Sequence, residues 1–399
     1  MSFKKKISYV LLIILNVYLY YYSYRYILKY NSTSTSPTYS DTPTLFKLLK
    51  YLLIFVLLLI FILYACKKKI KIRGRRIILF LAVLLLMLQE VYCFIVAKGF
   101  DQLIFAMCLA PPLLMITFDY SMDAKFVDKT FEIFVYIAIV YEFIQVGLFF
   151  LTKRLPALAY DTGVITDVRF GSVWDDPNGF GIFLAFLIPY SYMKFKGIKK
   201  IIITLILIGM LGLTWSLTAF LAVAAISVLG IIVSILKDTK RNIVIYIITI
   251  AAIIIGFFTA LIKIDSIVTL FENKMGSITE HLESFRFNDF TVYQFIGIIP
   301  KTIDFESGGV RLLYIGGILH FILFYGLSIT SLVRLRILAR KSSYSRLYLA
   351  MFWFIIAFLV ASVNLPLMYN FAIYGIYCLF IGYSFIPLYE DEEEKENAE

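Results

Sequence analysis

Long apolar runs constrain the fold of this chain more than any other feature. A helix needs about 20 mainly apolar residues to cross the hydrocarbon core of a bilayer. Measured against that length, the sequence predicts an all-α polytopic membrane protein with about twelve spanning helices, forming one integral domain over residues 1–399. The expected spans are 7–24, 45–65, 77–97, 102–118, 131–151, 178–193, 200–214, 217–236, 243–262, 317–336, 347–365 and 367–387.

Composition supports this class and argues against others. The chain is 61% hydrophobic and 16% charged, whereas soluble domains average about 45–50% and about 25%. The net charge of +11 lies mainly in short connections between apolar runs. That distribution is a topology signal, so we expect no nucleic-acid partner. The four cysteines lie in or beside apolar runs without metal-site spacing, and we expect them to be core residues.

Alternate connections differ in charge and predict the orientation. One set is basic and belongs in the cytoplasm, which places both termini there. No small-x-small cleavage site follows the first apolar run, so we expect that run to be a retained span. The acidic tail 388–399 is expected to be a solvated end. The basic set comprises Lys4–Lys6, Lys67–Arg76, Lys194–Lys200, Lys237–Arg241 and Arg334–Arg346.

Two segments of the opposite, external set are too long to be simple connectors. They are 152–177 and 263–316, the latter between the ninth and tenth spans. Loops of such length are usually functional or disordered. Aromatic residues occur throughout 263–316, which favours an ordered, partly helical subdomain at the outer interface.

The stretch Arg169–Gly181 carries the densest polar chemistry of the first external segment. Asp175 or Asp176 can cap the sixth span, with Pro177 at its first position. Such a helix start attracts anions, and Arg169 adds a fork suited to phosphate or carboxylate. The two carboxylates can serve as a general base or orient Arg169. The alternative is a capped helix with a surface Arg–Asp pair.

The second external segment supplies further candidates and leads into a histidine. His320 follows Gly316-Gly317 at the head of the tenth span, and it is the natural proton acceptor near neutral pH. The alternative is a histidine that hydrogen-bonds a neighbouring helix. His281 resembles a solvated loop residue. The other charged candidates are Arg286, Lys301, Glu306 and Arg311.

Two glutamates lie near the middle of predicted spans. Glu90 and Glu142 have Gln89 and Gln145 nearby. Intramembrane carboxylates are costly and often functional. They can form a proton relay in a transporter, or they can be interhelical hydrogen-bonding groups. The sequence has no Walker-type loop, no nucleophile elbow and no His-Glu-x-x-His motif.

The order of these polar residues resembles the O-antigen polymerase and ligase superfamily, which includes the Wzy-type repeat-unit polymerases and the lipopolysaccharide ligases. The resemblance covers roughly 165–330 together with the span count and orientation. Family members often have Asn after the histidine, where this chain has Phe321. The resemblance rests on Arg169, Asp-Pro-Asn at 176–178, Ser284-Phe285-Arg286, Gly297 after Arg286 in an Arg-x10-Gly pattern, Pro300, Gly308-Gly309 and His320.

This resemblance implies a GT-C-like membrane glycosyltransferase in a bacterial cytoplasmic membrane. It would polymerise undecaprenyl-diphosphate-linked oligosaccharides at the outer face, making a capsule, an exopolysaccharide or an O-antigen. It implies no metal and no cofactor, with the lipid bilayer, a flippase and a chain-length regulator as partners. The implied catalytic residues are His320, Arg286 and Arg169, and the implied diphosphate or sugar contacts are Arg311, Asp175, Asp176, Asn178 and Trp174.

Two alternatives stay open. A ligase that moves finished polymer onto an acceptor would use the same residues. The bias toward Ile, Lys, Tyr and Phe indicates a low-GC genome, and a Gram-positive source would favour a polymerase. A transporter or flippase predicts two related halves and polar groups at the midplane, whereas the polar residues here concentrate at one face.

Overall fold

The computed structural model describes the chain in separate ranges. These are residues 3–21, 23, 48–49, 51–52, 55–56, 59, 75–118, 122–152, 160–161, 168–174, 176–236, 251, 290–301 and 307–385. Several expectations fall on other residues and lie outside this description. They concern Arg286, Asp175, His281, Glu306, most of the spans 45–65 and 243–262, most of the external segment 263–316 and the tail 388–399.

The first half of the chain forms apolar helices close to the expected spans. They are α1 (Phe3–Tyr20), α4 (Arg75–Ala97), α5 (Phe100–Cys108), α6 (Ala110–Phe118) and α7 (Ala124–Thr152). The expected break in span 102–118 separates α5 from α6 at Leu109. Pro111 and Pro112 follow directly, and proline cannot donate the backbone hydrogen bond that would continue α5.

The connection from α7 to the central helices contains two short paired strands. Strand β1 (Tyr160–Asp161) pairs antiparallel with β2 (Val168–Arg169), with Tyr160 opposite Arg169. The chain then enters α8 (Pro177–Lys194), α9 (Gly197–Leu213) and α10 (Leu217–Leu236). The tight hairpin expected between the last two is present. It turns through Trp215, which has a left-handed φ of 47°.

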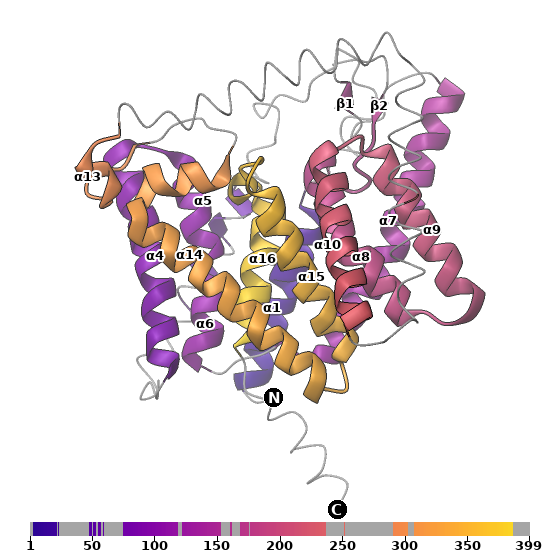
Figure 1. Cartoon of the computed structure of the whole chain (residues 1–399), viewed down its shortest axis with the longest axis horizontal. Helices are drawn as coiled ribbons and strands as arrows, with labels where there is room; N and C mark the ends of the chain where they lie inside the picture. Colours follow the sequence, from indigo (N-terminus) through magenta and orange to yellow (C-terminus); the bar gives the residue numbers. More distant parts are fainter. Residues whose placement is uncertain are drawn as a thin grey trace, which may run out of the picture.

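The last third contains a bent helix and a short helical connection. The elements are α13 (Val292–Phe295), α14 (Gly308–Lys341), α15 (Ser345–Ala361), η4 (Leu367–Tyr369) and α16 (Phe371–Ser384). Helix α14 is two segments, because Gly317 has φ 67° and ψ −167°. That conformation is open essentially to glycine alone. Figure 1 shows the first segment lying across the end of the second.

The described residues are mostly helical, with β1 and β2 as short exceptions among them. Three helices are long and apolar enough to cross a membrane: Arg76–Ala97, Ala124–Leu151 and Gly308–Lys341. Large apolar side chains project from two of these helices, including Ile78, Ile95 and Leu151 at 69%, 66% and 83% exposure. Exposed apolar surface of this kind marks contact with lipid or another apolar partner. The structure is therefore consistent with the expected all-α membrane class.

The core lies where α8, α15 and α16 meet. Helix α8 is buried on nearly every side. Its Phe186 ring centroid lies 5.4 Å from Phe183 and 5.3 Å from Phe380 of α16, and Phe354 of α15 lies 5.3 Å from Phe380. Aromatic packing of this kind fixes the relative positions of the three helices. Consequently, the ends of α8 and α16 are held in fixed positions.

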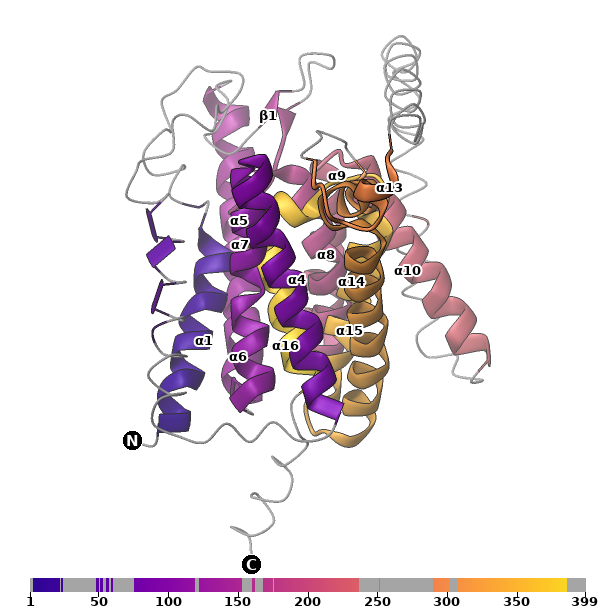
Figure 2. The same cartoon turned by 90° about the vertical axis from the view of Figure 1, so that its left-hand side faces the viewer.

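The two ends of the bundle have different polar residues. We call one the basic end, defined by Lys194, Lys196, Arg340, Lys341 and Arg346. The chain begins there, at the bottom of Figures 1 and 2. The opposite end, at the top of Figure 1, is the capped end, defined by the helix caps Asp176, Ser307 and Asn370.

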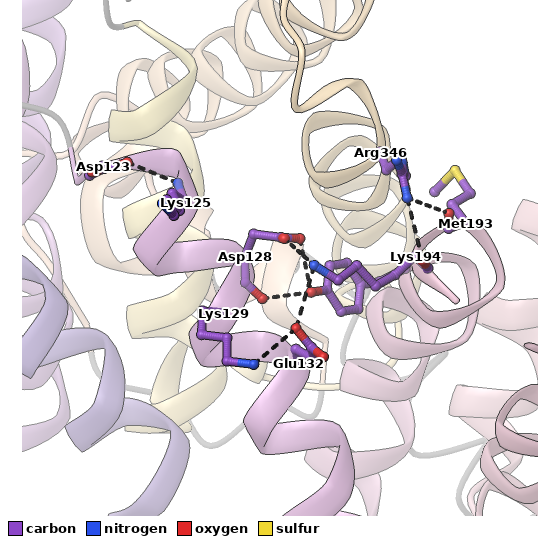
Figure 3. Close-up of polar contacts among 9 residues, drawn as sticks. Asp123, Lys125, Asp128, Lys129, Glu132, Met193, Lys194 and Arg346 are labelled. Carbon is purple, nitrogen blue, oxygen red and sulfur yellow. Dashed lines mark hydrogen bonds and ion pairs between the residues drawn. The ribbon is translucent and has the colours of Figure 1, made fainter. Parts of the chain in front are cut away.

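A satisfied ionic cluster ties three helices together at the basic end. Lys194 of α8 is paired with Asp128 and, at 3.5 Å, with Glu132 of α7. The Tyr190 hydroxyl donates to the Asp128 carbonyl at 2.6 Å. Arg346 of α15 donates to the carbonyls of Met193 and Lys194 at 3.2 and 3.3 Å (Figure 3). A cation at the carbonyl end of a helix is favourable.

Candidate functional site

Asp176 caps α8 at the capped end, which is one of the two alternatives that the sequence predicted. Its carboxylate accepts hydrogen bonds from the backbone N–H groups of Asn178 and Gly179 at 2.9 and 3.1 Å. Pro177 occupies the first helical position, where its missing N–H costs nothing. Asp175 lies outside the described residues.

The start of α16 is joined to this cap by a residue that sequence reasoning missed. Asn370 caps α16, since its side-chain oxygen accepts from the Ile373 N–H at 3.2 Å. Its amide nitrogen donates to Asp176 Oδ2 at 3.1 Å. A Cβ on Gly179 would lie 2.9 Å from that nitrogen, so glycine allows the approach. Asn directly before an apolar run was the signal available in the sequence.

Arg169 lies in this network with Asn178. Its Nε donates to the Thr214 carbonyl at 2.8 Å, and its Nη2 donates to Asn178 Oδ1 at 2.7 Å. Arg169 ends β2, and Thr214 follows α9. The guanidinium therefore links strand β2, the turn between α9 and α10 and the first turn of α8. Two residues expected in one site, Arg169 and Asn178, are in direct contact.

Trp174 has a different position from the one expected. We predicted a contact with diphosphate or sugar, but the side chain is 1% exposed. Its Nε1 donates to the Leu19 carbonyl at 2.7 Å, and its ring stacks on Phe183 at 5.0 Å. With its N–H satisfied and its faces packed, Trp174 fixes α1 against α8. Its hydrogen bond and its stacking both serve helix packing, so the structure places Trp174 in the core rather than in the network of Arg169 and Asn178.

The start of α14 forms the second part of the capped end. The Ser307 hydroxyl accepts from the Val310 N–H at 3.5 Å, and the Gly308 N–H donates to the Ser362 carbonyl at 2.9 Å. One turn later, the Arg311 guanidinium carbon lies 4.1 Å from the Tyr369 ring centroid. Arginine over an aromatic face is a favourable cation–π contact. Arg311, predicted from sequence, is thus held beside η4.

Tyr369 connects Arg311 to α5. Its hydroxyl accepts a hydrogen bond from Gln102 Nε2 at 3.4 Å. Burial raises the pKa of the Tyr369 phenol, the charge of Glu90 raises it further, and Arg311 lowers it. The phenol therefore stays protonated at neutral pH and keeps a hydrogen to donate. Nothing in the sequence singled out Tyr369 among the many tyrosines of the chain.

Tyr369 and Asn370 are consecutive, and together they join the two parts of the capped end. Tyr369 contacts Arg311 of α14, while Asn370 contacts Asp176 of α8. The starts of α8, α14 and α16 all lie at this end (Figure 1). Because a helix start carries partial positive charge, three of them with Arg169 and Arg311 favour an anionic ligand. The residues expected from the two external segments are therefore connected through η4.

His320 lies at the first turn after the break in α14, and it contacts Glu90 of α4. Its Nε2 is 2.9 Å from Glu90 Oε1, and both side chains are 0% exposed. The contact is close, but Nε2 and Oε1 are not aligned as a hydrogen bond. Glu90 Oε2 and His320 Nδ1 have no hydrogen-bond partner among the described residues. Sequence reasoning named both residues but did not pair them.

Helix α4 also holds the segment beside His320. Gln89 Nε2 donates to the Gly297 carbonyl and the Tyr92 hydroxyl to the Ile298 carbonyl, both at 3.0 Å. Gly297 has φ 78°, and a Cβ there would lie 2.4 Å from the Gly316 carbonyl oxygen. The two backbones touch because neither Gly297 nor Gly316 has a side chain. Gly297, noticed only for its spacing from Arg286, thus supports the histidine.

Glu142 belongs to a different environment. It is 3% exposed on α7, one turn before Gln145, whose Nε2 donates to the Ser172 carbonyl at 2.9 Å. Its carboxylate oxygens have no hydrogen-bond partner among the described residues. The two intramembrane glutamates thus make separate contacts, and the structure pairs one of them with the candidate base. Within the described ranges, no group of three or more His, Cys, Asp and Glu side chains could hold a metal ion.

Comparison with known proteins adds no family assignment. No protein-family model matches the chain, and searches of curated proteins and of solved structures return no match. The resemblance described above therefore rests on the residues of this chain alone.

Proposed function

We propose that this chain is a membrane glycosyltransferase that joins lipid-diphosphate-linked oligosaccharide repeat units into a polysaccharide. The lipid would be undecaprenyl diphosphate, and the reaction would take place at the outer face of a bacterial cytoplasmic membrane. A flippase that delivers the units and a chain-length regulator would be its partners. The architecture proposed with it is GT-C-like, with about twelve spans.

One observation carries this proposal: η4 joins residues from both external segments at one end of the bundle. Asn370 bonds Asp176, and its neighbour Tyr369 lies under Arg311. A polymerase must hold two lipid-linked chains at once, a donor and an acceptor. A junction built from two separate segments provides a surface for each. Anion-favouring helix starts surround this junction, as a diphosphate donor requires.

The chemistry needs little beyond charge and a proton acceptor. The acceptor hydroxyl oxygen attacks the anomeric carbon of the donor, the bond from that carbon to the diphosphate oxygen breaks, and its electron pair leaves with the diphosphate. Arg311 would stabilise the developing charge, together with Arg286 from the second external segment. His320 would take the hydroxyl proton. Arg169 would act by holding Asn178 and the α8 start in place.

The proposed orientation follows from the basic end. Lys194, Lys196, Arg340, Lys341 and Arg346 gather there, and basic connections stay in the cytoplasm. Both termini would then be cytoplasmic, and the capped end would face outward. Flipped repeat units are available on that side, and the diphosphate is already a competent leaving group, so no nucleotide sugar is required there.

Deletion of the gene in the native host, followed by analysis of lipid-linked sugars, tests this function. A polymerase deletion accumulates single repeat units on the lipid at the outer leaflet. Long lipid-linked polymer would instead indicate a ligase. Units trapped at the inner leaflet would indicate a flippase. Either of the last two results overturns the proposal.

A further inference from the structure

The buried contact between Glu90 and His320 carries an inference that deepens the proposed function and rests on it. We propose that Glu90 is the positioning residue for His320: its carboxylate holds Nε2 and leaves Nδ1 to accept the proton of the acceptor hydroxyl. Glu90 lies on α4, outside both external segments that supply the other candidates. The site would thus have a third contributor from within the bundle.

The ring of His320 is confined on several sides. Phe105 of α5 lies 6.0 Å away between ring centroids. A Cβ on Gly316 would lie 2.4 Å from His320 Cβ, 2.5 Å from Cγ and 2.6 Å from Nδ1. The imidazole therefore lies directly over a backbone that has no side chain. Glu90 lies 2.9 Å from one nitrogen of the ring, and the Gly316 backbone lies against the edge that carries Nδ1, so both nitrogens are enclosed in this structure.

A carboxylate at Nε2 suits this environment for two reasons. First, it favours the tautomer that carries the proton on Nε2, so the lone pair is on Nδ1. Second, an imidazolium in an enclosed site is costly unless an opposite charge lies beside it. At 2.9 Å and 0% exposure for both side chains, Glu90 supplies that charge. Once the pair has accepted the proton, its net charge is the same whether that proton lies on the imidazole or on the carboxylate.

The proton balance of the proposed step is complete. The O–H bond of the acceptor breaks and its proton goes to His320 Nδ1, while Nε2 keeps its proton beside Glu90. The acceptor oxygen forms the new bond to the anomeric carbon, and the diphosphate leaves with the electron pair. The imidazolium then returns its proton to the departing diphosphate or to water. No oxidant, reductant or metal is needed.

The test compares Glu90→Gln, Glu90→Asp and Glu142→Gln in the purified full-length protein, using lipid-diphosphate-linked repeat units as substrate. Glutamine keeps the shape of the side chain and removes its charge. We expect Glu90→Gln to lower kcat by about 100-fold, in the range of a lost acid–base contribution. KM for the lipid-linked donor should stay within about twofold, since Glu90 does not touch it. Glu90→Asp should recover part of kcat, because it restores the charge.

Glu142→Gln is the matched control. It removes a second buried glutamate, on α7, whose polar neighbours are Gln145 and Ser172 and not His320, so kcat should stay near wild type. Equal losses of kcat from Glu90→Gln and Glu142→Gln would overturn the proposal, because they would mean a general requirement for buried carboxylates. Full activity of Glu90→Gln would overturn it as well.

A double-mutant cycle separates positioning from structure. If Glu90 acts through His320, adding Glu90→Gln to His320→Gln should not lower the residual rate further. Additive losses would overturn the proposal. Thermal unfolding of the wild type, the two single variants and the double variant gives a readout that does not depend on activity. The free energies of unfolding can be coupled even if none of the four proteins polymerises the substrate. That result would refute the proposed function and the positioning role together. Only the contact between Glu90 and His320 would then remain established. Polymerisation with additive losses would refute the positioning role alone.

Discussion

The two ends of this bundle use charged residues in opposite ways. At the basic end, Lys194 is paired with Asp128 and Glu132, and each of these side chains is about one-fifth exposed. At the capped end, Glu90 and His320 are fully enclosed, and one polar atom of each has no partner among the described residues. Both ends place charge between helices, but the charged groups of the basic end pair with one another, whereas Glu90 and His320 keep unused hydrogen-bonding capacity among the described residues.

This difference separates stability from function. A partly exposed ion pair keeps part of its hydration, and its opposite charges compensate one another. An enclosed pair with unused acceptors costs free energy, because desolvation is not fully compensated. Such a cost is retained where the groups act on a substrate. The glycine contacts at Gly297, Gly316 and Gly317 add further constraint at the same place. We therefore assign the chemistry to the capped end and helix packing to the basic end.

The largest expected effect is on activity, from His320→Ala. A lost general base typically costs about 100- to 10,000-fold in rate. In a deletion host, this variant should leave single repeat units on the lipid, as the deletion does, while the protein is present at the normal level. Lys194→Ala at the basic end is the matched control and should restore polymer of normal length. The reverse pattern would mean that the two ends have been assigned the wrong way round.

Gly316→Ala should be the next most severe change. The new methyl would lie within 2.4–2.6 Å of His320, and inserting a carbon into a packed site costs about 1–3 kcal/mol. We expect lower thermal stability together with a loss of turnover, because the imidazole must move from Glu90. Gly326→Ala on the same helix has nothing within 4 Å of the new Cβ and should change neither. Wild-type turnover by Gly316→Ala would show that the ring does not need its present place.

The coupled caps predict a smaller loss. Asp176→Ala removes the cap of α8 and the bond to Asn370, and a lost cap costs about 0.5–2 kcal/mol. Asn370→Ala removes the cap of α16 and the same bond. The two substitutions share one contact, so their combined effect on the free energy of unfolding should be less than the sum. Strict additivity would argue against a direct link between the two helix starts.

Lys194→Ala should have the smallest effect on turnover of the four. It leaves Asp128 and Glu132 without their shared cation, and because about one-fifth of each side chain is exposed, the cost should stay below the ~3–5 kcal/mol of a fully buried pair. The loss should shrink at high salt, because solvated charges are screened. Turnover should stay within about twofold of wild type. A large loss of turnover at unchanged stability would place part of the chemistry at the basic end.

Much of the fold followed from the length of the apolar runs and from the residues that interrupt helices. The predicted span 217–236 has the bounds of α10, and 178–193 lies within α8. Pro111-Pro112 predicted the break between α5 and α6, and Asp-Pro predicted the start of α8. These features are local, because a proline or a capping side chain acts within one helical turn. Local chemistry is what a single sequence displays.

The candidate site depended on contacts between segments far apart in the chain, which no local rule gives. His320 and Glu90 were each noticed as costly polar groups in apolar helices, but only packing of α4 on α14 joins them. Tyr369 and Asn370 were missed because they lie in a short connection within an expected span. Trp174 was placed with the substrate because polar neighbours surround it in the sequence, whereas its large apolar surface is buried in the core.

The most direct test of the central claim is polymerisation by the purified protein in liposomes, with lipid-diphosphate-linked repeat units as the only substrate. The wild-type protein should produce a ladder of chain lengths and release one lipid diphosphate for each linkage formed. His320→Ala should produce neither, and Lys194→Ala should produce both. Absence of any ladder with folded wild-type protein would contradict the account, as would a full ladder with His320→Ala.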